Sequence, residues 1–396
     1  MNFPKFLRPV FLTLPLALVF LSCGGSDDTQ DPLPSSSLAT KYAVVATGAS
    51  DYSSGAHSTL TYSEPRSATN DLLPTISDLK ISSYGKFFYR MERLGSNSIT
   101  KFSIDDPSTP IWQYSTDEAG DTNSNPSALI VINDVKAYLL RYNSSKAWIV
   151  NPSATNEADF KIGELDLSAY DEGDGAPEMA SAVRLGGRLF IALQRYSMAL
   201  FAPDESYIAV FNIDTDTEID TDPSTPGLKG IKLDVRNPDG EIKYNDGYIY
   251  VPGADDMWGG SATFGGIQRV NTTTYAVDPI MIGTTNKNIT RVEIISPTKG
   301  YLIKYEAIWI APWSKTHLMS FNPQTGTVDP ANVAGIGNSG DRNLQDIAAD
   351  SDGLLWVADG SATDPGIYII DPATDTIQEG PISTNLNPLD IVFCEK

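Results

Sequence analysis

One acidic run has a spacing that could bind a metal ion. Residues 214–222 read DTDTEIDTD. In an extended chain alternate side chains point to the same side, so the acids of this run would share one face and offer the hard oxygen ligands that Ca²⁺ prefers. The run lacks the glycine and the terminal glutamate of an EF-hand loop, and the alternative is a solvated hairpin tip. The sequence establishes no cofactor; Ca²⁺ is the candidate it offers, with the ligands Asp214, Asp216, Glu218 and Asp220.

The sequence has few residues that could support other metal sites or catalysis. His57 and His317 are the only histidines, which excludes a three-histidine metal site. No P-loop, GxGxxG, GxSxG or HExxH motif is present. A hydrolase, lactonase or lyase would therefore depend on carboxylates such as Asp255, Asp256 or Glu306 with a divalent metal.

Four long segments combine aromatic and charged residues: 48–58, 194–206, 252–266 and 306–315. Aromatic side chains beside a few polar groups are typical of surfaces that bind a sugar, a peptide or another protein. The alternative is that they only cover a hydrophobic core. The predicted ligand-binding residues are Tyr52, His57, Arg195, Asp255, Asp256, Trp258, Trp309 and Trp313.

A repeated pattern must position these segments. Seven short runs of similar character begin at positions about 44 to 62 residues apart, which fits one four-stranded propeller blade per repeat. A second and a third apolar run follow most of them, and the third usually ends in an Asx-Pro or Asx-Thr turn. The runs are SDLKIS, SALIVIN, MASAVRL, EIKYND, RVEIIS, QDIAAD and LDIVF.

The last repeat begins a blade at Leu389, but the sequence stops at Lys396. The runs KYAVVATG and STLTYSE near the other end have strand character and no first strand before them. We therefore predict an all-β, seven-bladed propeller of four-stranded antiparallel blades, in which strands from both ends of the chain share one blade. Six or eight blades are the alternatives.

The segment from Asp350 to Val357, DSDGLLWV, is followed by Ile370-Asp371-Pro372. It resembles the repeats of NHL-type, streptogramin-lyase-type and YncE-like propellers. The resemblance implies a fold and not an activity, because these motifs specify a blade.

The first residues of the sequence predict that the protein is exported from the cytoplasm. Residues 1–22 have a short basic start and an apolar run too short to span a bilayer, as in a secretion signal. With Ser22-Cys23-Gly24 the segment resembles a bacterial lipoprotein signal, which implies lipidation of Cys23 and an outer-membrane location. Residues 23–40 read as a flexible tether, and 41–396 as the propeller domain. The other cysteine, Cys394, is then expected to be a small buried residue without a disulfide.

The formal charge of −22 argues against a nucleic-acid partner, because an acidic surface repels phosphates. We expect a monomer whose lipid holds it to the membrane and whose partner is a protein or a glycan. The predicted function is a lipid-anchored binding module of the cell envelope. The alternatives are a propeller enzyme and a purely structural scaffold.

Overall fold

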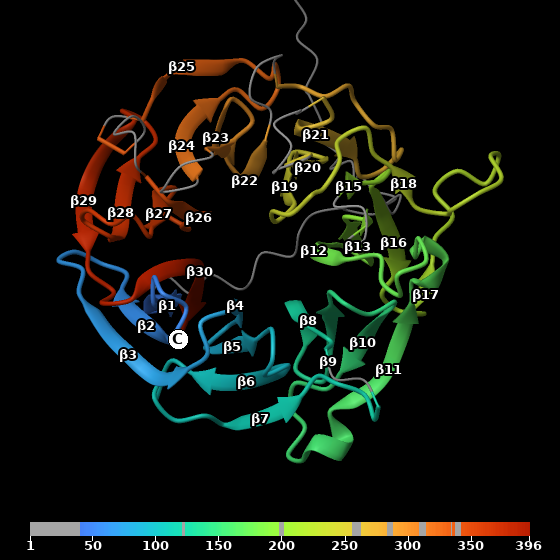
Figure 1. The fold of residues 1–396 in the computed structure, drawn as a ribbon, viewed down its shortest axis with the longest axis horizontal. Helices are drawn as coiled ribbons and strands as arrows, with labels where there is room; N and C mark the ends of the chain where they lie inside the picture. Colours follow the sequence, from blue (N-terminus) through green and yellow to red (C-terminus); the bar gives the residue numbers. More distant parts are fainter. Residues whose placement is uncertain are drawn as a thin grey trace, which may run out of the picture.

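The computed structural model describes residues 40–396 apart from 121–122, 198–201, 256–262, 283–287, 309–313, 334 and 337–341. Seven antiparallel sheets stand around a common axis (Figure 1). The chain is a seven-bladed β-propeller, as predicted.

Blade 1 has the strand order β30-β1-β2-β3 from the axis outward, and its strands come from both ends of the described chain. The strands are β1 (Lys41–Gly48), β2 (Gly55–Thr61), β3 (Ala68–Thr75) and β30 (Asn387–Glu395). Lys41 is opposite Glu395 and Gly48 is opposite Asn387. The backbone amides of Thr40 and Lys396 each donate to the carbonyl of the other residue, at 3.0 and 2.9 Å. The predicted sharing of one blade by the two ends is confirmed.

Three blades follow in chain order. Blade 2 has β4 (Leu79–Tyr84), β5 (Phe87–Glu92), β6 (Ser98–Ser103) and β7 (Trp112–Ser115). Blade 3 has β8 (Pro126–Asn133), β9 (Lys136–Arg141), β10 (Lys146–Val150) and β11 (Lys161–Asp166). Blade 4 has β12 (Met179–Leu185), β13 (Arg188–Leu193), β16 (Tyr207–Asn212) and β17 (Thr217–Glu218), with β18 (Ile231–Lys232) also paired to β16.

Three more blades complete the ring. Blade 5 has β19 (Lys243–Asn245), β20 (Tyr248–Gly253) and β21 (Gly266–Asn271). Blade 6 has β22 (Ile289–Ser296), β23 (Lys299–Ala307), β24 (Ser314–Phe321) and β25 (Val328–Asn332). Blade 7 has β26 (Leu344–Ala349), β27 (Leu355–Asp359), β28 (Gly366–Asp371) and β29 (Thr376–Ile382). In blade 5 the outermost position has an isolated bridge, Val270 to Val277, among the described residues.

The hydrophobic core lies between successive blades. Middle strands such as β9 and β27 are buried along almost their whole length, because a neighbouring blade covers each of their two faces. Outer strands such as β3 and β29 alternate between half-buried and exposed residues. Cys394 is a fully buried free thiol in the cluster between blades 1 and 2, where burial raises its pKa to about 12.

The turns after the third strands follow the predicted chemistry. In blades 2 to 7 an Asn or Asp side-chain oxygen accepts the amide N–H two residues later. Examples are Asn151 with Ser153 at 3.0 Å, Asn322 with Gln324 at 2.9 Å, and Asp371 with Ala373 at 2.8 Å. The repeated sequence signature is therefore a repeated Asx turn.

A basic or imidazole side chain joins each of six blades to the turn region after the third strand of the next blade. Lys101 donates to the Pro152 carbonyl at 2.9 Å, and Arg188 donates to the Thr272 carbonyl at 2.9 Å. The other four contacts join His57 to Pro107, Lys136 to Ile213, Arg269 to Pro323 and Lys299 to Asp375. We call these the interblade contacts.

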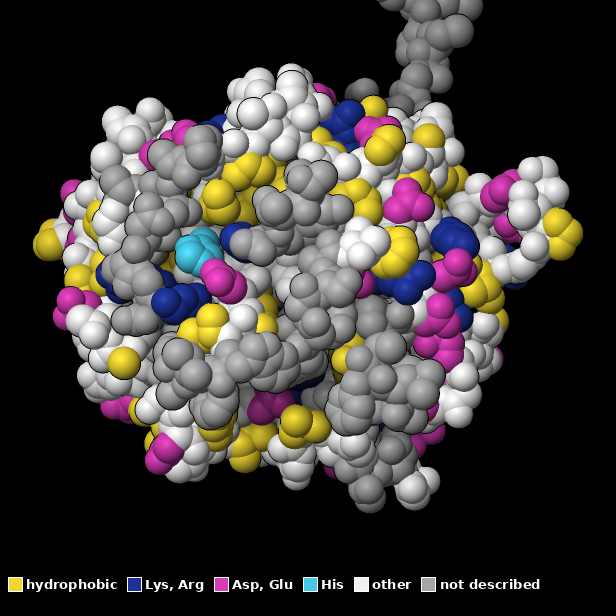
Figure 2. All heavy atoms as spheres, turned by 45° about the horizontal axis from the view of Figure 1, so that its top comes forward, with side chains coloured by type: hydrophobic (Ala, Val, Ile, Leu, Met, Phe, Trp, Pro, Cys, Tyr) yellow, Lys and Arg dark blue, Asp and Glu magenta, His cyan; other side chains and the backbone are white. Residues whose placement is uncertain are grey.

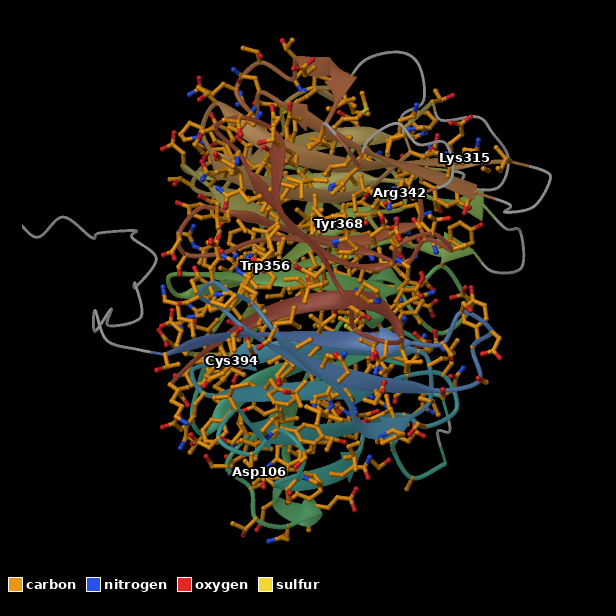
Figure 3. The ribbon with its side chains drawn as sticks, turned by 90° about the vertical axis from the view of Figure 1, so that its left-hand side faces the viewer. Asp106, Lys315, Arg342, Trp356, Tyr368 and Cys394 are labelled. Atoms are coloured by element: carbon orange, nitrogen blue, oxygen red, sulfur yellow. The ribbon has the colours of Figure 1, made fainter. Side chains whose placement is uncertain are left out.

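The ring has two different ends. The connections from second to third strands and from blade to blade leave at one end, the loop end, toward which Lys315 and Arg342 lie in Figure 3. The other two kinds of turn lie at the turn end, toward which Cys394 and Asp106 lie. Strand β1 starts at the turn end with Lys41. Among the described residues no helix is long and apolar enough to cross a bilayer.

Candidate functional site

Several predicted rim residues lie outside the described residues: Asp256, Trp258, Trp309 and Trp313. The four predicted rim segments, 48–58, 194–206, 252–266 and 306–315, are second-to-third-strand connections, and all leave at the loop end. Tyr52 is described and lies there with 83% of its surface exposed. This exposure is compatible with ligand binding by Tyr52, which stays a prediction.

Two other predicted ligand-binding residues hold loops in place. The Arg195 guanidinium forms an ion pair with Glu172 and donates to the carbonyls of Tyr170 at 2.9 Å and Glu205 at 2.7 Å. Asp255 is buried, and its carboxylate accepts the Phe264 amide at 2.9 Å. Both have left-handed backbone conformations, which turn the chain at the ends of β13 and β20.

His57 was predicted in a rim loop, and this placement is wrong. It lies within β2 opposite Ala46 and is fully buried. Its Nε2 donates to the Pro107 carbonyl at 2.7 Å, so its Nδ1 is the acceptor for Arg90 at 2.9 Å. Burial and, to a smaller extent, the positive charge of Arg90 together lower the His57 pKa to about 3. His57 is a neutral core residue that does not meet a ligand.

The acidic run does not form the predicted calcium site. Strand β17 covers only Thr217–Glu218, and Asp216 has a left-handed φ of 55°, so the alternation assumed for an extended chain fails. Asp216 pairs with Lys136 and Tyr138, whereas Glu218 accepts from Tyr170. Asp214 and Asp220 are both exposed. Across the described part of the chain, no three His, Cys, Asp or Glu residues are grouped to hold a metal.

Polar side chains from all seven blades instead follow one another around the axis, and we call this series the polar belt. The series starts in blade 2, where Arg93 bonds Asp78 at 3.1 Å and lies over the Tyr142 ring of blade 3 at 5.9 Å. Tyr142 donates to Gln194 of blade 4, and the Gln194 amide donates to Asp239 before blade 5 at 3.3 Å.

The belt continues through the remaining blades with charged residues of the innermost strands. Arg291 of blade 6 lies 3.8 Å from Asp239 and 3.6 Å from Asp346 of blade 7. Asp390 of blade 1 lies 3.7 Å from Lys80 of blade 2, which completes the circle. The belt is therefore made by all seven blades.

Two belt carboxylates also connect the innermost strands. The Asp346 Oδ2 accepts the Ile391 amide at 3.0 Å, and the Asp390 Oδ2 accepts the Ile81 amide at 3.0 Å. Each acid thereby satisfies a backbone donor on the open inner edge of the next blade. The two carboxylates lie near enough to repel each other. Burial and the repulsion of Asp390 raise the pKa of Asp346 well above its ordinary value.

Three further charged residues lie beside the belt: Glu293 on β22, Glu241 just before β19 and Lys243 within β19. Lys243 pairs with Glu241 at 2.8 Å and with Glu293 at 3.1 Å. The Lys243 charge lowers the pKa of Glu241 to about 2, whereas burial raises the pKa of Glu293. Sequence reasoning missed all of these residues. The available signal was a charge at alternate positions of otherwise apolar first strands, as in EIKYND, RVEIIS and QDIAAD.

An acidic corner of blade 4 adjoins the belt at the loop end. Burial raises the pKa of Glu178 to about 8, although its carboxylate accepts the Tyr196 amide at 2.9 Å. Burial also raises the pKa of Glu172 to about 7, against the opposing effect of Arg195. Asp174 adds its negative charge to both sites. These carboxyls titrate near neutral pH, a property found at both functional and structural sites.

The described surface of the loop end has no extended patch of one charge. Figure 2 looks obliquely onto this end, and its basic and acidic side chains are interspersed with hydrophobic ones. Such a mixed surface suits a specific polar contact better than non-specific binding to a polyanion.

Comparison with known proteins adds the fold and no family. No protein-family model and no curated protein matches the sequence. A solved protein from Lactobacillus plantarum is similar, with a TM-score of 0.59 and 12% identity over 90% of this chain and 99% of that one. So is dihydro-heme d1 dehydrogenase NirN in complex with DHE, with a TM-score of 0.51 and 11% identity over 89% and 75%. At these identities the likeness shows the propeller fold alone.

Proposed function

We propose that this protein is a propeller of the cell envelope, anchored by a lipid on Cys23, which binds a ligand or a partner protein at its loop end and does no covalent chemistry. The observation that carries the proposal is the contrast between the two ends. At the turn end the blades repeat one Asx turn, whereas at the loop end long, dissimilar connections surround the polar belt.

The position of β1 supports the orientation in this proposal. Lys41 begins β1 at the turn end, and the proposed tether of residues 23–40 leads directly into that strand. A lipid at Cys23 would then attach the turn end to the membrane and direct the loop end away from it. The long connections would be free to meet a partner.

Replacement of Cys23 by Ser tests the anchor. We expect the wild-type protein to incorporate radiolabelled palmitate and to partition with membranes, and Cys23→Ser to lose both properties. A variant that remains lipidated and membrane-bound would contradict the anchor and leave the binding proposal untouched.

Binding is tested with a matched pair of exposed apolar residues at the two ends. Tyr52 is 83% exposed at the loop end, and Val135 is 57% exposed in the turn between β8 and β9 at the turn end. Immobilised wild-type protein is used to capture envelope proteins and to screen a glycan array. We expect Tyr52→Ala to weaken the bound signal at least about threefold, as for a contributing interface residue, and Val135→Ala to leave it unchanged. Equal losses in both variants would contradict a loop-end site.

A second candidate, a propeller hydrolase or lyase, is favoured by the acidic corner. Glu178 and Glu172 have pKa values near 8 and 7, the range that suits a general acid or base. Turnover of an ester, lactone or glycoside that disappears in Glu178→Gln would support this candidate over the binding module.

A further inference from the structure

The acids of the polar belt leave one side-chain oxygen without a hydrogen-bond partner. Asp390 is 1% exposed and its Oδ1 is buried with no such partner, while its Oδ2 is held by the Ile81 amide. Asp346 is 5% exposed, and its Oδ1 lies 3.6 Å from the Arg291 Nε. A buried carboxylate oxygen without a donor is costly, so this position favours a ligand that brings N–H groups.

The basic residues beside the pair do not satisfy it. Lys80 lies 3.7 Å from the Asp390 Oδ2, and Arg291 lies 3.6 Å from the Asp346 Oδ1, both beyond hydrogen-bond distance. The Arg291 Nε is itself without a hydrogen-bond partner, and its NH1 donates to its neighbour Thr290. The pair therefore keeps capacity for another donor.

The charges around the axis have a negative excess. Five acids face three bases in this part of the ring, a formal excess of two negative charges: Asp239, Glu241, Glu293, Asp346 and Asp390 against Lys80, Lys243 and Arg291. The side chains of Asp239 and Glu241 are 44% and 43% exposed, so solvent reaches the acids next to the buried pair. Two partly exposed acids therefore lie beside the buried pair.

We propose that Asp346 and Asp390 form a site for the ammonium group of a linear alkyl amine, which enters along the axis past Asp239 and Glu241. An ammonium group has three N–H donors and a positive charge, which match two adjacent carboxylates that each have one oxygen committed to a backbone amide. A metal ion fits less well, because the described residues hold no group of three ligand side chains. The proposal stands independently of the partner at the rim.

The pKa of Asp346 supplies a second readout. Burial, Asp390 and Glu241 raise this pKa, whereas Arg291 and Lys80 lower it. At neutral pH the Asp346 carboxyl therefore keeps its proton more readily than an exposed acid does. An ammonium group favours the ionised carboxylate, so binding should release a proton to the buffer.

The test is calorimetry on the purified full chain in detergent, with putrescine and butylamine as probes and butanol as the uncharged control. We expect both amines to bind with a heat that depends on the buffer's ionisation enthalpy, and butanol not to bind. Asp390→Asn and Asp346→Asn should each weaken binding about tenfold or more, the effect of one charge-assisted hydrogen bond. Their amide oxygens can still accept the Ile81 and Ile391 amides.

The control is Asp371→Asn, because Asp371 also accepts a backbone amide but lies in a turn of blade 7 at the turn end. It should bind the amines as the wild type does. The proposal is overturned if neither amine binds at millimolar concentration, or if both Asp variants retain wild-type affinity while folded by circular dichroism. Binding of Ca²⁺ or K⁺ in place of the amines, with the same dependence on Asp390, would overturn the choice of ligand.

Discussion

The turn end and the loop end of the ring are built by the same seven repeats but follow different rules. At the turn end a few contacts recur from blade to blade: an Asx turn, and a side chain from the preceding blade that reaches it. At the loop end the connections differ in length and composition, and the polar contacts there use different residues in each blade. We call the recurring contacts the frame of the protein. The loop-end connections, which differ from blade to blade, are the part that can vary to acquire a function.

Large effects on stability are expected at buried polar groups, and small ones at exposed residues of the rim. The three variants below run from the largest expected effect to the smallest. Each compares the free energy of unfolding of a variant with that of the wild type in urea.

Arg90→Met should be the most damaging substitution. Arg90 is 1% exposed, and its guanidinium donates to Glu92 at 2.8 Å, to the Leu73 carbonyl at 2.8 Å and to His57 at 2.9 Å. Its removal leaves Glu92 charged and buried without its counterion, which costs about 3–5 kcal/mol. Lys146→Met is the control, because Lys146 pairs with Glu164 at the surface, where such pairs contribute about 1 kcal/mol or less. Equal effects of the two variants would contradict a buried frame network.

Glu178→Gln should change stability in a pH-dependent way. The folded-state pKa of about 8 exceeds the ordinary value of 4.5, so the folded protein holds this proton more tightly than the unfolded chain does. This contribution is fully present below about pH 4.5 and is lost as the pH rises through 8. We expect the variant to be more stable than the wild type by about 1–3 kcal/mol at pH 9 and similar to it at pH 5. Parallel pH profiles would show that Glu178 titrates normally.

Tyr52→Ala should have the smallest effect on stability, within about 0.5 kcal/mol, because the ring is exposed. Its carbonyl accepts the Ser77 hydroxyl at 2.9 Å, and this backbone contact survives the substitution. An unchanged free energy of unfolding, together with a loss of binding, would show that Tyr52 contributes to binding at the rim and not to the stability of the frame. A loss above about 1 kcal/mol would place Tyr52 in the frame instead.

The sequence was sufficient to predict the frame, because the features that build it are local and repeated. All seven predicted first strands coincide with the innermost strands, from β4 to β30, and the shared blade follows from their count. The Asx turns were predictable for the same reason, since each depends on a side chain and an amide two residues apart.

The site was less predictable, because its contacts join residues that are distant in the sequence. The predicted strand STLTYSE begins at Ser58, one residue after His57, but pairing with β1 extends the strand back to Gly55 and so includes His57. Asp216 breaks the assumed alternation through a backbone angle that the pattern DTDTE does not reveal. The belt depends on which blades are neighbours, and only the closed ring brings Asp390 beside Lys80.

The hydrogen bonds between Thr40 and Lys396 have a consequence for biosynthesis. Strand β30, the innermost strand of blade 1, follows all the other described strands in chain order, so β1 must wait for this partner until those strands have been synthesised. Until then blade 1 lacks its innermost strand, and the ring cannot close. Ring closure is therefore a late folding step that joins segments far apart in the sequence, and such long-range pairing is slow compared with the formation of local contacts.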